Sequence, residues 1–115
     1  MSKSNISIFL SGIRPQNWKR LYDSIQPAID NYSFELVISS PYQLPNELKN
    51  KLEIKWIETW RAPTPGYQLA ALQCESDLMT FVADDGWLLP QKLGEIIKFL
   101  KDKESEQEHW KNVVV

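Results

Sequence analysis

Residues 80–90, TFVADDGWLLP, end an apolar run on two adjacent aspartates, Asp84 and Asp85. The run from Leu78 to Ala83 contains almost no polar side chain, which is typical of a strand buried on both faces of a parallel sheet. Pro90 suits the first turn of a helix, because its missing N–H would have no intrahelical partner there. The stretch therefore predicts a buried strand, an acidic turn and a helix, in that order.

The rest of the chain shows alternating strand and helix patterns. Three further runs have the β-branched and aromatic composition of strands: NISIFLS (5–11), FELVIS (34–39) and LEIKWIE (52–58). The last of these alternates with charged residues, which predicts a position near a sheet edge. Apolar residues at helical spacing predict three helices, which contain Trp18 to Ile25, Tyr67 to Cys74 and Leu93 to Leu100.

The segments between these elements read differently. Pro27 marks where the first helix is expected to stop or kink. The proline-bearing segment 40–50 reads as a loop with at most one short helical turn, and 61–66 reads as another loop. WKNVVV, residues 110–115, looks like a fifth strand just beginning.

Helices interleaved with apolar strands imply right-handed crossovers onto one sheet. We therefore expect residues 1–115 to form a single α/β domain, a three-layer α/β/α sandwich with a mostly parallel, Rossmann-like sheet. Ligands of such sheets bind beyond the carboxyl ends of the strands. Those ends are predicted at Ser11-Gly12, Ser39-Ser40 and Asp84-Asp85, so the paired acids lie where a site is expected.

Composition excludes several classes of protein. The net charge of −2 and the absence of a basic stripe argue against nucleic acid as a partner, and no run is long enough for a membrane span. Cys74 is the only cysteine, so a reducing compartment and hence the cytoplasm is expected. Its place on an apolar helical stripe favours a buried small residue over a nucleophile. His109 is the only histidine, so zinc is not expected.

The two aspartates allow two interpretations. Asp-Gly is favoured in ordinary turns for local backbone reasons. Alternatively, Asp84 and Asp85 hold a divalent cation, because adjacent carboxylates repel one another unless a cation or hydrogen-bond donors offset the charge. Arg14 suits either a phosphate partner or a solvated surface position. Trp87 suits either stacking on a ligand or capping of the core.

Three segments together resemble a known family: ISIFLSGIRPQNWKRLYDSI (6–25), FELVISS (34–40) and PGYQLAALQCESDLMTFVADDGWLLPQKL (65–93). In order and spacing they are similar to the N-terminal, donor-binding half of family 2 nucleotide-sugar glycosyltransferases, which have the GT-A fold. The likeness runs from about Asn5 to Leu100. The resemblance implies a nucleotide-diphosphate sugar as donor and transfer of the sugar to an acceptor that the sequence does not identify.

The resemblance also implies site residues. Asp85 matches the acid that binds Mg²⁺ or Mn²⁺, and Asp84 is the middle residue of the motif. The expected donor-binding residues are Ser11, Gly12, Arg14, Ser39, Ser40, Gln68 and Asp84. Ser39 and Ser40 stand where the family usually has aspartates, and Gln68 replaces an asparagine, so the nucleobase is left open. The family's catalytic base would lie in a half that follows Val115, so no catalytic residue is assigned.

The alternative is a non-catalytic relative that keeps the fold as a binding or interaction module. The two serines in place of acids and the apolar end of the chain motivate this interpretation. It predicts self-association if an apolar strand forms an open sheet edge.

Overall fold

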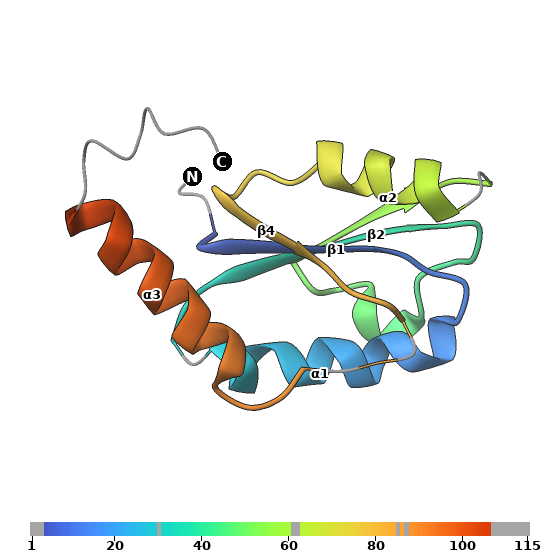
Figure 1. Ribbon diagram of the computed structural model, residues 1–115. Helices are drawn as coiled ribbons and strands as arrows, with labels where there is room; N and C mark the ends of the chain where they lie inside the picture. Colours follow the sequence, from blue (N-terminus) through green and yellow to red (C-terminus); the bar gives the residue numbers. More distant parts are fainter. Residues whose placement is uncertain (1–3, 30, 61–62, 85, 87, 107–115) are drawn as a thin grey trace.

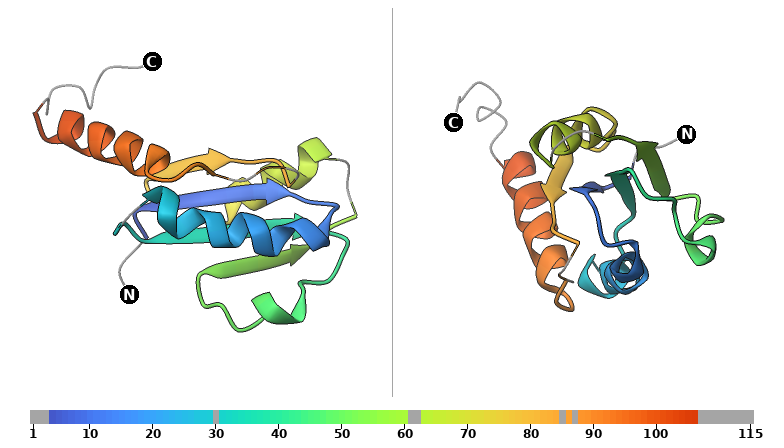
Figure 2. Two further views of the ribbon diagram at one scale, coloured as in Figure 1. Left: turned by 90° about the horizontal axis from the view of Figure 1, so that it is seen from below. Right: turned by 90° about the vertical axis from the view of Figure 1, so that its right-hand side faces the viewer.

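The computed structural model describes residues 4–29, 31–60, 63–84, 86 and 88–106, and it shows a three-layer α/β/α arrangement (Figure 1). The elements follow in the order β1 (Ile6–Ser11), η1 (Pro15–Asn17), α1 (Trp18–Ile29), β2 (Phe34–Ser40), η2 (Asn46–Leu48), β3 (Ile54–Glu58), α2 (Pro63–Leu72), β4 (Leu78–Phe81) and α3 (Lys92–Glu106). One face of the sheet carries α2, and the opposite face carries α1 with α3 beside it (Figures 1 and 2).

The described strands form one sheet in the order β3-β2-β1-β4, and every neighbouring pair is parallel. This arrangement confirms the predicted α/β class with a parallel sheet. The edge position predicted for β3 is confirmed as well. Parallel pairing brings the carboxyl ends of the strands to one edge, where Ser11 of β1 lies opposite Ser39 of β2.

The apolar core lies between the sheet and α1. Alternate residues of β1 and β2 point to this face, and they share one buried cluster with the apolar stripe of α1. The fully buried side chains include Ile8, Leu10, Leu36, Ile38, Trp18, Leu21 and Ile25. The helical spacing recognised from Trp18 onward therefore has a direct packing cause.

The α2 face of the sheet carries a buried polar network at the amino ends of the strands. The Glu35 carboxylate accepts hydrogen bonds from the Ser7 hydroxyl at 2.5 Å and from the Glu75 backbone N–H at 2.6 Å, and Lys55 Nζ lies 3.0 Å away. Burial would raise the pKa of Glu35, but these donors outweigh it and hold that pKa below its usual range. The network fastens the segment before β4 to the sheet.

One predicted strand differs in its surroundings. β4 was expected to be buried on both faces, yet Met79 is 48% and Phe81 69% exposed. The cause is topological, because β4 is an edge of the described sheet and α2 packs on β1 and β2 instead. The fifth strand predicted at 110–115 lies outside the described residues.

The helix boundaries also correct the sequence expectations. Pro27 lies inside the last turn of α1, where it is exposed, and its carbonyl oxygen accepts a hydrogen bond from the Gln91 N–H at 2.9 Å. Pro90 precedes α3, because Gln91 has a φ of 64° and interrupts regular helix before Lys92. Part of the segment expected as a loop, from Pro63 onward, forms the first turn of α2. None of the described helices is both long and apolar enough to cross a bilayer.

The packing of α3 on α1 generates a stability prediction. Ile97 is fully buried in the core cluster, whereas its neighbour Ile96 is 54% exposed. Ile97→Ala should lower the free energy of unfolding by about 2–5 kcal/mol, because it leaves a cavity between α3 and the core. Ile96→Ala is the matched control and should change it by less than about 0.5 kcal/mol. Urea denaturation followed by circular dichroism measures both, and equal losses would contradict this packing.

Candidate functional site

A pocket of about 260 Å³ opens at the edge where the parallel strands end. Residues from five separate segments line it: Ser11 at the end of β1 with Gly12 and Arg14 after it, Pro41 after β2, Trp60 after β3, Tyr67 of α2, and Asp84 after β4. The position agrees with the rule that α/β sheets bind ligands beyond the carboxyl ends of their strands.

Asp84 joins two of these segments. Its Oδ2 accepts hydrogen bonds from the backbone N–H groups of Ile13 and Arg14, both at 2.7 Å, and its Oδ1 lies 2.9 Å from Arg14 Nη1. The residue is only 4% exposed. Burial alone would raise the pKa of Asp84, but the two backbone donors and the guanidinium outweigh it and lower that pKa. Asp84 is therefore an ionised clamp on the loop that follows β1.

Gly12 is the first residue of this loop and passes close to the buried Trp18. Its backbone N–H donates to the Ser39 carbonyl oxygen at 2.9 Å. A Cβ at this position would lie 2.8 Å from Nε1 of Trp18, whose indole is fully buried and rigidly held. Only glycine therefore lets the chain pass so close to the start of α1.

Gly66 brings the first turn of α2 onto the sheet. A Cβ on Gly66 would lie 2.3 Å from the Ser11 hydroxyl oxygen and 3.2 Å from that of Ser39. The Ser39 hydroxyl is buried and finds no hydrogen-bond partner among the described residues. An unpaired buried hydroxyl is costly, so this edge of the sheet holds unused hydrogen-bonding capacity.

Aromatic side chains form another wall of the pocket. The Tyr67 hydroxyl donates to the Val82 carbonyl oxygen at 2.9 Å, and its ring meets Phe9 and Phe81 edge-on at centroid distances of 6.3 and 5.9 Å. Trp60 is 79% exposed, which leaves its ring face available to a ligand.

The structure brings together four of the predicted donor-site residues, namely Ser11, Gly12, Arg14 and Asp84. The others are placed differently. Ser39 lies buried beneath Gly66, and the Ser40 hydroxyl accepts a hydrogen bond from the Tyr42 N–H at 3.0 Å. Gln68 is exposed on α2 and does not line the pocket. Asp85 and Trp87 lie outside the described residues.

Sequence reasoning missed the contribution of the segment after β3. Thr59 and Trp60 line the pocket although neither was named as a candidate. The signal was available, since the same rule about carboxyl ends applies to the third strand as much as to the others. Tyr67 was assigned only to a helical stripe, and its role as a pocket wall depends on how α2 crosses the sheet.

Among the described residues, those of the pocket included, metal and nucleophile chemistry find little support. Among the described residues, no group of three His, Cys, Asp or Glu side chains is placed to hold a metal ion. Burial, followed by the nearby Glu35 charge, raises the pKa of Cys74, which disfavours the reactive thiolate. Cys74 is half-buried rather than fully buried as predicted, and its raised pKa disfavours a nucleophilic role.

Comparison with solved structures finds the crystal structure of S. aureus TarS 1-349, with a TM-score of 0.71 and 18% sequence identity. The match covers 87% of this chain and 33% of that chain, so this chain spans about a third of the TarS structure. No family model and no curated protein matches the sequence. At this identity the likeness shows the fold alone, and it confirms the predicted α/β fold class with a parallel sheet.

The Asp84 clamp generates a prediction about pH and stability. Its pKa is lower in the folded chain than the unfolded value of about 3.9. Its stabilising effect is therefore complete well above that value and is lost as the pH falls through the folded pKa. Asp84→Asn should lower the free energy of unfolding at neutral pH by about 1–3 kcal/mol and flatten its dependence on acid pH.

Urea denaturation at a series of pH values measures both effects. Asp102→Asn, on the exposed side of α3, is the control and should leave both quantities nearly unchanged. The depressed pKa of Glu35 leaves some acid sensitivity in every variant. An Asp84→Asn chain with the stability and acid dependence of the original would show that the clamp contributes nothing.

Proposed function

We propose that this chain is a glycosyltransferase-type donor-binding domain that holds a nucleotide-diphosphate sugar with Mg²⁺ or Mn²⁺ at the carboxyl edge of its sheet. The observation that carries the proposal is the pocket itself, in which Asp84 fixes Arg14 and the loop after β1 beside the first turn of α2. The glycosyltransferase-like fold supports the same choice.

The electrostatics of the pocket suit a diphosphate. Arg14 uses one guanidinium nitrogen for Asp84, and its side chain remains 47% exposed, so further N–H groups face solvent. The first turn of α2 lies against Ser11, and the helix dipole attracts negative charge at its amino end, where Pro63 and Pro65 contribute no N–H. The proposed arrangement has the diphosphate between Arg14 and this helix turn.

A divalent cation would neutralise the charge that develops on the departing diphosphate. Such ions need hard oxygen ligands and accept phosphate oxygens alongside one or two carboxylates. Both oxygens of Asp84 already accept hydrogen bonds, so Asp84 suits a role in holding the loop better than direct ligation. In the proposed arrangement Asp85 supplies the carboxylate, and Asp84 fixes the segment that carries it.

The remaining surfaces suit the nucleoside and the sugar. The exposed ring of Trp60 offers a stacking face for a base or a sugar. The Ser39 hydroxyl is fully buried beneath Gly66 and does not line the pocket, so no contact with the base is assigned to it.

Transfer of the sugar requires more than donor binding. An inverting reaction needs a general base for the acceptor hydroxyl. Among the described residues that line the pocket, Asp84 has the only carboxylate, and its pKa is lowered by the donors that occupy it. The proposal therefore assigns donor binding to this pocket and leaves the base to residues beyond it.

Calorimetric titration of the full chain with UDP, GDP, CDP and ADP, with and without Mn²⁺, tests the proposal. At least one nucleotide should bind, and removal of Mn²⁺ should weaken that binding at least about tenfold, because the ion bridges phosphate and carboxylate. Asp85→Ala should abolish the Mn²⁺ dependence, and the matched control Asp102→Ala should not. The proposal fails if none of the four nucleotides binds in either condition.

A second candidate function, an interaction module, is favoured by the exposed edge of β4. Met79 and Phe81 present apolar side chains beside this edge in the described part of the sheet. Light scattering should then show dimers at micromolar concentration, and Phe81→Lys should convert them to monomers, because a charged edge resists pairing. A monomer in the unaltered chain would remove this candidate.

A further inference from the structure

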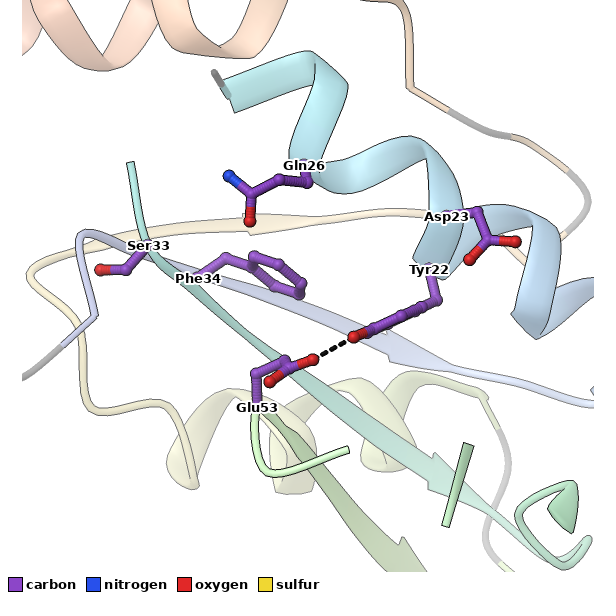
Figure 3. A pocket seen from close by; sticks show the side chains of 6 residues that line it. All are labelled: Tyr22, Asp23, Gln26, Ser33, Phe34 and Glu53. Carbon is purple, nitrogen blue, oxygen red and sulfur yellow. Dashed lines mark hydrogen bonds between the residues drawn. The ribbon is translucent and has the colours of Figure 1, made fainter. Parts of the chain in front are cut away.

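A second pocket lies at the amino end of β2, on the α1 face of the sheet (Figure 3). It has a volume of about 420 Å³, and its lining residues are Tyr22, Asp23, Gln26, Ser33, Phe34 and Glu53. β2 runs from Phe34 to Ser40, and its rise of about 3.3 Å per residue places this pocket about 20 Å from the first one. It is therefore separate from the proposed donor site.

Two aromatic rings form the wall of this pocket. Tyr22 of α1 and Phe34 of β2 meet with ring centroids 5.9 Å apart and planes inclined at 59°. Phe34 is only 8% exposed and belongs to the core cluster, so the core holds this wall in place. The volume lies in the range of small-molecule sites, and the pocket is open to solvent.

The charge on the pocket rim is negative. The Glu53 carboxylate accepts a hydrogen bond from the Tyr22 hydroxyl, drawn in Figure 3, and no described lysine or arginine lies within ion-pair distance of it. Asp23 has a lysine partner, Lys19 at 2.5 Å. Burial, and then the Glu53 hydrogen bond and charge, raise the pKa of Tyr22 to about 12, so Tyr22 remains a neutral donor.

A lysine ammonium of the same chain lies near the Tyr22 ring. The ammonium of Lys51 lies 5.7 Å from the centroid of the Tyr22 ring, within cation–π distance. This lysine is exposed and reaches the ring from the segment before β3. The Tyr22 ring therefore already has a positive charge within cation–π distance.

We propose that this pocket binds a small organic cation, with an ammonium group beside the Glu53 carboxylate at the face of the Tyr22 ring and an apolar body against Phe34. Anions are disfavoured by Asp23 and Glu53, and a neutral apolar ligand leaves Glu53 without a counter-charge. A bare divalent metal would need more oxygen ligands than these two separated acids provide. The ligand chemistry is opposite to that of the proposed donor site.

Two-dimensional ¹H–¹⁵N NMR of the full chain, titrated with benzylamine, tests this proposal. Saturable shifts should appear at the amides of Tyr22, Phe34 and Glu53, with a Kd on the order of 1 mM or tighter. Benzyl alcohol has the same shape without the charge and should bind at least about threefold more weakly. Raising the salt concentration should weaken benzylamine binding, because the carboxylate is partly solvated.

Variants separate the charge from the shape of the pocket. Glu53→Gln keeps an acceptor for the Tyr22 hydroxyl but should raise the benzylamine Kd at least about threefold. Glu95→Gln, an exposed acid on α3, is the matched control and should leave that Kd unchanged. Lys51→Gln removes the competing ammonium and should lower the Kd. If Glu53→Gln does not fold, Tyr22→Phe is the alternative variant, because it keeps the aromatic ring. The benzylamine Kd of Tyr22→Phe should be equal to or lower than that of the original chain.

Three outcomes would overturn the proposal: equal binding of benzyl alcohol and benzylamine, an unchanged Kd in Glu53→Gln, or shifts confined to residues outside the pocket. The ammonium could come from a free amine or from a protein lysine. A parallel titration with Nα-acetyl-lysine-N-methylamide distinguishes the two sources, and tighter binding of either compound with Glu53 dependence supports the cation site. None of these results depends on nucleotide binding at the other pocket.

Discussion

The geometry of the sheet edge where the parallel strands end depends on one buried carboxylate, that of Asp84. Asp84 follows β4 and accepts three hydrogen bonds from Ile13 and Arg14, which lie about 70 residues earlier in the chain. A buried charge of this kind is stable only when donors replace its lost water, and two backbone N–H groups with a guanidinium do so here. The contact positions the loop after β1 and the Arg14 side chain relative to the end of β4, so the geometry of the pocket follows from it.

The two faces of the sheet serve different purposes. The α1 face is apolar and supplies most of the core, whereas the α2 face carries polar residues at both ends of β1 and β2. At the amino ends Ser7 and Glu35 fasten the segment before β4. At the carboxyl ends Ser11 and Ser39 make room for the first turn of α2, which only Gly66 permits. The polar face therefore organises the connections, and the apolar face stabilises the fold.

The two pockets lie at opposite ends of β2 and differ in chemistry. The carboxyl-end pocket combines Arg14, a helix amino terminus and the exposed ring of Trp60, a combination that suits an anionic donor. The amino-end pocket combines the Glu53 carboxylate with the rings of Tyr22 and Phe34, a combination that suits a cation. Because the strands separate them, each is open to its own ligand and to an independent test.

The sequence by itself determined the order of the elements, the parallel α/β class and the edge where Ser11, Gly12, Arg14 and Asp84 meet, because these follow from local periodicity and from the right-handed crossover. The sequence predicted that β4 is buried on both faces, but β4 is partly exposed because α2 packs on β1 and β2 instead. It also missed Trp60 and included Gln68, because the direction of a side chain at a helix or strand end depends on distant packing. Only the tertiary structure decided that Asp84 clamps a loop, since its donors come from a distant segment that no local pattern connects to it.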